Sequence, residues 1–186
     1  RERPAIFSQA QAEQLARDGA VLVEQLDGEE PLLLMACGSY QLAEMQRAAV
    51  RLRTAGLAYR LVYVQEPGRF RAPRDRWEAQ ALASPEVVAQ LFAPALRRRV
   101  LLTHMRPEVA RGHLWPLLPD ASNTVVLGYR NRGGTLDEAG MQFANSATWA
   151  HILDACAQLL QVPLSDVLSA AEITAVKGEG DPRVLR

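Results

Sequence analysis

Short apolar runs alternate with longer amphipathic segments along this chain. Five of the runs predict β-strands, at residues 20–26, 31–37, 59–64, 98–105 and 124–129. The second run is apolar without alternation, which is typical of a strand covered on both faces. Because only a short turn separates it from the first run, we expect these two strands to be antiparallel neighbours.

Amphipathic segments with helical spacing lie between and after these runs. One begins after Gly38, with Ser39 as the expected N-cap, and Gly56 follows its predicted C-terminus. Its apolar face consists of Leu42, Met45, Ala49 and Leu52. Together with the flanking strands, this helix predicts a right-handed parallel crossover. The clearest stripe belongs to a final helix that begins near Ser146 and ends at Pro163. Its members are Trp149, Ile152, Leu153, Cys156, Leu159 and Leu160.

The order of these elements predicts one α/β domain. Further short helices are expected at residues 84–92, 107–115 and 164–172. The sum is a three-layer α/β/α fold around a mixed, five-stranded, Rossmann-like sheet whose first strand is antiparallel. We expect a single domain over residues 1–186, with an N-terminal arm (1–19), an α/β core (20–172) and a tail (173–186). Because the first residue is not methionine, we expect the C-terminal part of a longer polypeptide.

Composition narrows the classes of partner and compartment. The 21 basic and 21 acidic side chains cancel, so charge gives no reason to expect nucleic acid or an anionic membrane as a partner. No apolar run approaches the roughly 18 to 20 residues of a membrane span. Two cysteines do not make a disulfide framework and favour a reducing compartment. We therefore expect a cytoplasmic protein that binds neither nucleic acid nor membrane.

Two chemically active residue types lie at the carboxyl ends of predicted strands. Ligands of open parallel sheets bind beyond the carboxyl ends of the strands, where Cys37 and His104 are expected. They could form the nucleophile and base of a small cysteine hydrolase. The alternative is a buried, inert thiol and a histidine that caps a strand end. No third residue is evident that would orient the histidine.

Two segments could hold an anion. Gly38 and Ser39 open a predicted helix, where backbone N–H groups and the helix dipole favour negative charge. Arg69 and Arg71 belong to an arginine-rich loop that suits phosphate or carboxylate recognition. The alternatives are a capped helix with a tight entry turn, and a solvated or subunit-contact loop. Glycine-rich phosphate motifs, H-E-x-x-H and paired cysteines are absent from the sequence, so the residues alone assign no catalytic, cofactor-binding or metal-binding role.

The stretch at residues 129–145 has the order of a phosphate cradle, with a strand, a glycine pair and a helix. A cradle needs its glycines at the helix N-terminus, but these glycines precede the predicted final helix by about a dozen residues. We therefore interpret the stretch as a packing or interface loop, in which the arginines could meet a partner's carboxylate. The interface candidates are Arg130, Arg132, Gly133, Gly134 and Thr135.

Two stretches resemble known enzymes. Residues 33–64 resemble the opening of the C-terminal domain shared by transketolase-like enzymes, in which a strand ends in a Gly-Ser turn before an alanine-rich helix. Residues 128–160 resemble the last strand, glycine-threonine loop and final helix of phosphoketolases, and residues 91–105 fit the same pattern. The matching positions in the loop region are Gly128, Tyr129, Gly134, Thr135, Met141 and Asn145. The usual Thr-Pro-Phe-Asp-Met is replaced by Asp-Glu-Ala-Gly-Met, which points to a divergent subgroup.

The resemblance implies a function. Phosphoketolases are aldehyde-lyases that use thiamine diphosphate and Mg²⁺ to cleave xylulose 5-phosphate or fructose 6-phosphate with phosphate, giving acetyl phosphate. Their cofactor lies between the first two domains of a homodimer, so a third domain holds no cofactor, metal or catalytic residue. Such a domain would contact the other domains of the parent chain and the second subunit, and would be inactive alone. The alternative is a free-standing, Rossmann-like regulatory domain for a small anionic ligand.

Overall fold

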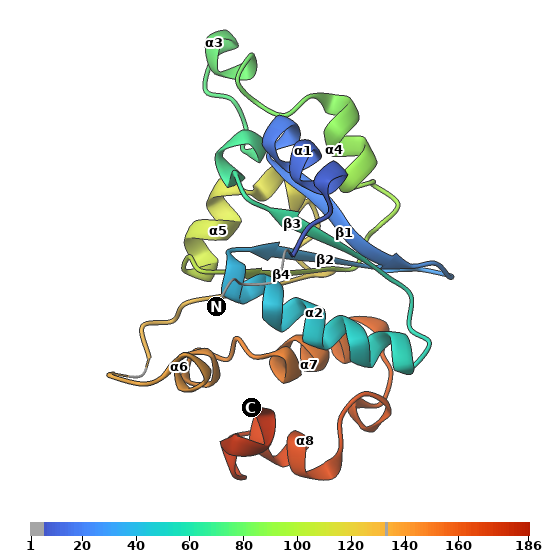
Figure 1. The fold of residues 1–186 in the computed structure, drawn as a ribbon, viewed down its shortest axis with the longest axis vertical. Helices are drawn as coiled ribbons and strands as arrows, with labels where there is room; N and C mark the ends of the chain where they lie inside the picture. Colours follow the sequence, from blue (N-terminus) through green and yellow to red (C-terminus); the bar gives the residue numbers. More distant parts are fainter. Residues whose placement is uncertain (1–5, 133) are drawn as a thin grey trace.

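The computed structural model describes residues 6–132 and 134–186, whose core is a five-stranded sheet between two layers of helices (Figure 1). The strands are β1 (Ala20–Leu26), β2 (Leu32–Cys37), β3 (Tyr59–Val64), β4 (Arg99–Thr103) and β5 (Thr124–Leu127). They lie in the order β1-β3-β2-β4-β5, and β1 alone among these five runs antiparallel to its neighbour. The predicted mixed sheet with an antiparallel first strand is confirmed.

Helices cover both faces of the sheet, as the sequence predicts. The α-helices are α1 (Gln9–Asp18), α2 (Ser39–Thr54), α3 (Arg76–Ala79), α4 (Pro85–Leu91), α5 (Pro107–His113), α6 (Glu138–Ala144), α7 (Trp149–Leu160) and α8 (Ala170–Val176). Short 3-10 helices are η1 (Pro67–Phe70), η2 (Trp115–Leu117), η3 (Leu164–Asp166) and η4 (Pro182–Leu185). In Figure 1, α2 and α7 lie below the sheet with α8 beyond them, and α1, α4 and α5 lie above it.

The central strand β2 shows why two layers are needed. All six of its side chains are buried. Leu32, Leu34 and Ala36 pack on the face covered by α2 and α7. The alternate residues Leu33, Met35 and Cys37 pack on the face covered by α4 and α5. Because successive side chains of a strand point to opposite faces, a continuous apolar run is stable only between two apolar layers.

The expected pairing of the first two strands is wrong. Leu26 at the end of β1 and Leu32 at the start of β2 both pair with Tyr59, so β3 lies between them. The connection at residues 27–31 crosses two strand spacings, roughly 10 Å, which five residues can span. The apolar β2 takes a central place, whereas β1, with partly exposed side chains, takes the edge.

Two helix predictions also need correction. Ser39 is the first residue of α2 and not its N-cap; Gly38 takes that place, with φ of +117° and no side-chain cap. The stretch before the final helix contains the unpredicted helix α6, which begins only a few residues after Gly134. Its N-cap is Asp137, whose carboxylate accepts a hydrogen bond from the N–H of Gly140. The predicted Gly56, with φ of +69° just past α2, has the expected left-handed conformation.

Both ends of the described chain pack against the core. Within the predicted arm, α1 packs beside β1 and buries Leu15. Within the predicted tail, Leu185 is buried and its carbonyl oxygen accepts hydrogen bonds from Trp149 Nε1 at 2.8 Å and from Arg47 at 3.1 Å. The guanidinium of Arg47 also lies 5.2 Å from the centre of the Trp149 ring. The C-terminal residues are therefore held against α2 and α7.

Candidate functional site

The parallel strands β2, β4 and β5 end at one edge of the sheet, and a small hollow lies beyond them. Cys37 pairs with Thr103 at this edge, so the residues that follow each strand are brought together. The hollow measures about 150 Å³. Its lining includes Gln41, Thr103, His104, Tyr129, Gln142 and Asn145. The structure thus unites residues from α2, the ends of β4 and β5, and α6.

Cys37 and His104 do not form an activated nucleophile. The Cys37 side chain is 1% exposed, and burial raises the pKa of its thiol, opposed by a hydrogen bond from Thr103. His104 Nδ1 lies 3.0 Å from the carbonyl oxygen of Cys37, not beside its sulfur. Because a carbonyl only accepts, Nδ1 carries the proton in this contact and Nε2 is the free nitrogen. A protonated, buried thiol is a poor nucleophile, so this arrangement does not support hydrolase chemistry.

Gly38 is needed where β2 turns into α2. A Cβ at this position would lie 2.2 Å from Gln41 Oε1 and 3.3 Å from His104 Nδ1. The amide oxygen of Gln41 therefore lies over the Gly38 backbone, which His104 Nδ1 also approaches. Gln41 is 8% exposed, and its amide atoms are not among the fully buried polar atoms without a partner, which in the described residues are Tyr59 Oη and Thr124 Oγ1. Neither Gly38 nor Ser39 lines the hollow, so the anion site predicted at these two residues stays a prediction.

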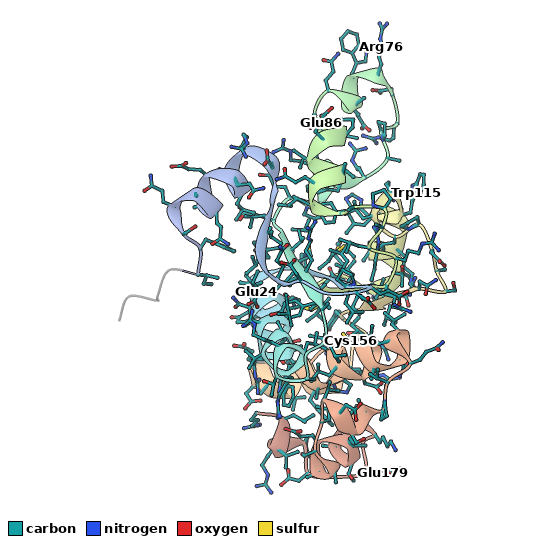
Figure 2. The ribbon with its side chains drawn as sticks, turned by 90° about the vertical axis from the view of Figure 1, so that its right-hand side faces the viewer. Glu24, Arg76, Glu86, Trp115, Cys156 and Glu179 are labelled. Atoms are coloured by element: carbon teal, nitrogen blue, oxygen red, sulfur yellow. The ribbon has the colours of Figure 1, made fainter. Side chains whose placement is uncertain are left out.

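Arg69 and Arg71 do not line this hollow. Arg69 donates to the backbone carbonyl of Arg17 at 2.7 Å. Arg71 forms an ion pair with Glu78, and interactions with Arg71 and Arg74 hold the pKa of that carboxyl far below its usual range. Arg69 belongs to η1, whereas Glu78, the partner of Arg71, belongs to α3, where Figure 2 shows Arg76 at the projecting end of the domain. The two candidate anion-binding segments, the arginine-rich loop and Gly38, therefore do not share one site. Arg69 is already bonded to a carbonyl oxygen and Arg71 to a carboxylate.

Asn145 holds the loop between β5 and α6. Its side chain is buried, at 3% exposure. Oδ1 accepts from the N–H of Arg130 at 2.8 Å and of Arg132 at 3.3 Å. Nδ2 donates to the carbonyl oxygens of Arg132 at 3.1 Å and Met141 at 2.8 Å. All of the strong hydrogen-bonding positions of this amide are thus used inside the domain, which makes Asn145 a structural residue.

Gly128 fixes the start of the same loop. A Cβ at this residue would lie 2.4 Å from the carbonyl oxygen of Met105. The N–H of Tyr129 donates to that oxygen at 3.0 Å, so the chain leaves β5 in close contact with the chain leaving β4. Two positions of the phosphoketolase resemblance therefore have a direct geometric reason.

The interface candidates lie on the outside of this loop. Arg130, Arg132, Gly134 and Thr135 are exposed, and Gly133 lies outside the described residues. Neither arginine forms an ion pair with a residue that the structure describes. Leu136 beside them is 49% exposed. The loop thus presents free cations next to an apolar side chain.

Neither a metal cluster nor a membrane-spanning helix is found in the described ranges. No group of three or more His, Cys, Asp or Glu side chains in residues 6–132 and 134–186 could hold a metal ion. In the same part of the chain, no helix has the length and hydropathy of a membrane span.

No family model matches this sequence, and no curated protein is significantly similar to it. Solved structures share its fold. Transketolase from Leishmania mexicana superposes with a TM-score of 0.56 at 15% identity, over 80% of this chain and 19% of that one. A structure described as split gene transketolase, inactive beta4 tetramer, gives 0.55 at 16% identity, over 86% and 47%. Transketolase from Campylobacter jejuni gives 0.50 at 12% identity, over 84% and 20%.

At these identities the similarity establishes the fold. This chain spans less than half the length of each of those three transketolases. It therefore has the mixed α/β/α fold of one portion of a transketolase chain.

Proposed function

We propose that this chain is a non-catalytic domain of a thiamine-diphosphate-dependent enzyme of the phosphoketolase type. The parent enzyme would cleave xylulose 5-phosphate or fructose 6-phosphate with inorganic phosphate and release acetyl phosphate. The domain would support contacts between domains and between the subunits of a homodimer. In this proposal, residues 1–186 act as one unit within a larger cytoplasmic assembly.

The observation that carries this proposal is the loop between β5 and α7. Its resemblance to phosphoketolases depends on several spaced positions, of which Gly128 and Asn145 have the tightest geometry. Gly128 has no room for a Cβ, and Asn145 is bonded to both sides of the loop. These residues lie in a fold that three transketolases share. A matching pattern at positions that shape the backbone supports common ancestry more than one at exposed positions would.

The outer face of the loop is suited to a contact. Arg130 and Arg132 are exposed and free of carboxylate partners among the described residues, and the partly exposed Leu136 lies next to them. Arginine beside apolar surface is enriched in protein interfaces because its planar guanidinium both stacks and pairs with carboxylates. The proposal assigns this surface to another domain of the enzyme or to the second subunit.

The cofactor would be bound elsewhere in the parent enzyme. Mg²⁺ with thiamine diphosphate requires oxygen ligands around the metal, and the described residues of this chain offer no cluster of side chains for it. The proposal therefore places the metal-bound cofactor in another part of the parent enzyme. This domain would help to position the polypeptide that binds the cofactor, which would belong either to the same chain or to a separate subunit.

Reconstitution tests the proposal. The 186-residue chain is incubated with thiamine diphosphate, Mg²⁺, xylulose 5-phosphate and phosphate, and acetyl phosphate is measured as the hydroxamate. We expect no product from this chain alone and acetyl phosphate after it is combined with the thiamine-binding part. If the complete enzyme instead transfers the two-carbon unit only to an aldose phosphate, the phosphoketolase assignment is wrong but a transketolase-like parent stands. Turnover by the chain alone would refute the non-catalytic role.

Charge reversal tests the contact surface. Arg130→Glu should weaken association with the thiamine-binding part by about tenfold, or 1.4 kcal/mol, because an interface cation becomes an anion. The matched control is Arg97→Glu, which makes the same change at an exposed arginine at the opposite edge of the sheet. Equal effects of the two variants on the association constant would remove the assignment of this surface.

A further inference from the structure

A groove lies between the segment that leads into α3 and the end of α5. It measures about 390 Å³ and is lined by Arg71, Ala72, Arg74, Gly112, His113 and Trp115. It shares no lining residue with the hollow at the ends of the parallel strands. Sites for small molecules commonly measure about 300–1,000 Å³, so this groove has the size of a small-ligand site.

The groove carries an excess of positive charge. Arg71 and Arg74 both pair with one carboxylate, that of Glu78. The same interactions hold the pKa of Glu78 far below its usual range, so this carboxylate stays ionised and offsets one of the two positive charges. Among the described residues, no Asp or Glu lines the groove itself, and the Arg74 side chain is 82% exposed. These guanidinium groups can therefore pair with phosphate or carboxylate oxygens of a ligand.

Trp115 gives the groove a flat aromatic wall. Its side chain is 59% exposed, and Figure 2 shows it at the surface on the same side of the sheet as Arg76. A Cβ at the neighbouring Gly112 would meet no described atom within 4 Å, so the space beside the indole is open. His113 adds a ring nitrogen that can donate a hydrogen bond. Because aromatic rings stack on indole, this combination favours a ligand with both a ring and an anionic group.

We propose that this groove binds a nucleoside phosphate, whose base stacks on Trp115 and whose phosphates pair with Arg71 and Arg74. His113 donates a hydrogen bond to a phosphate oxygen. A nucleotide is favoured over an acidic protein segment because one small molecule supplies both the ring and the charges within a groove of this size. The site keeps Arg71 from the predicted arginine-rich anion site but not Arg69, which does not line the groove. It belongs to this domain and does not depend on the reaction of the parent enzyme.

The indole N–H signal of Trp115 locates the binding. The ¹⁵N-labelled 186-residue chain is titrated with ATP, and separately with adenosine and with inorganic triphosphate, at constant ionic strength. We expect a saturable shift of this signal with ATP. Adenosine and triphosphate should each bind at least about fivefold more weakly, because each lacks one of the two contacts. The absence of a saturable shift with ATP in the millimolar range, or triphosphate that binds as tightly as ATP, would overturn the proposal.

Two matched pairs of variants test the stacking and the charge. Trp115→Ala should weaken ATP binding at least about fivefold, whereas Trp77→Ala removes a tryptophan that is 66% exposed outside the groove and should leave the affinity within about twofold. Arg74→Glu should weaken binding at least about tenfold, whereas Arg76→Glu makes the same change outside the groove and should weaken it less than about threefold. These side chains are exposed, so the variants should fold. Equal losses within either pair would contradict the site.

Discussion

Replacement of Asn145 by alanine should destabilise the domain without exposing its core. The change removes four hydrogen bonds between this side chain and the backbone of Arg130, Arg132 and Met141. A net value of about 1 kcal/mol each gives an upper bound of about 4 kcal/mol. The loop is exposed, so water can replace part of the loss. We therefore expect a decrease of about 2–3 kcal/mol in the free energy of unfolding.

Urea unfolding followed by circular dichroism measures this loss. For a chain of this size, about 2–3 kcal/mol corresponds to a fall of roughly 5–10 °C in the melting temperature. Hydrogen exchange adds a local readout, because the amides of Arg130 and Arg132 should lose protection before the sheet does. The control is Gln142→Ala, which truncates a side-chain amide within α6 that makes no hydrogen bond to a described residue. This change should lower the free energy of unfolding by less than about 0.5 kcal/mol.

Asn145→Asp separates hydrogen bonding from side-chain volume. It keeps the acceptor for the two N–H groups but places carboxylate oxygen against the carbonyls of Arg132 and Met141. Burial and these carbonyls should raise the pKa of the new carboxyl in the folded state, so the variant should lose stability as pH rises through the acidic range. A loss below about 0.5 kcal/mol in Asn145→Ala, with unchanged exchange, would refute the structural role.

Three further predictions concern the core and its edge. Arg99→Met should lower the free energy of unfolding by about 3 kcal/mol in urea, because this arginine is 3% exposed and donates to four buried or partly buried backbone carbonyls. Arg99→Lys should recover only part of the loss. Gly128→Ala should lower the free energy of unfolding by about 2–4 kcal/mol, because the new Cβ would clash with the Met105 carbonyl. The control is Gly112→Ala, whose Cβ would meet nothing within 4 Å. It should be neutral or stabilising by about 0.5–1 kcal/mol in thermal unfolding. Burial lowers the pKa of His151 from 6.5 to about 4, so the unfolded state binds the proton more readily than the folded state. The free energy of unfolding should therefore fall by up to about 3 kcal/mol as pH falls from 6.5 to 4. His151→Leu should remove this part of the pH dependence.

The layers of the fold could be predicted because burial of a strand or helix determines the pattern of apolar residues along that segment. The run at residues 31–37 has no polar face, and the helical stripe from Trp149 to Cys156 has one apolar side. The order of the strands in the sheet produces no such pattern in the sequence. The connection between β1 and β2 is long enough for either a direct pairing or a step across β3, and the choice depends on which strand best tolerates an edge.

Helix α6 was missed for a related reason. None of its side chains is fully buried, so it has no apolar stripe, and Gly140 interrupts its first turns. The available signal was Asp137 at its N-cap, three residues before Gly140. Without α6, the segment from Gly134 to the final helix is too long for a phosphate cradle. The structure instead places Gly134 four residues before the start of α6. That helix is too short to serve as an anion site, so the interpretation of the loop as a contact surface stays a prediction.

Two side-chain amides at the carboxyl ends of the strands, Asn145 and Gln41, differ in how they are hydrogen-bonded. Beyond β5, Asn145 uses its amide fully within the domain, so nothing remains for a ligand. Beyond β2, Gln41 lines the hollow and is 8% exposed, and its amide atoms are not among the fully buried atoms without a partner. The sequence cannot distinguish these two amides, because their environments depend on residues far apart in the chain, such as Gly38 and His104. Asn145 therefore fixes the loop from inside the domain, whereas the Gln41 amide keeps contact with solvent and is not one of the buried groups that would have to be satisfied by the fold.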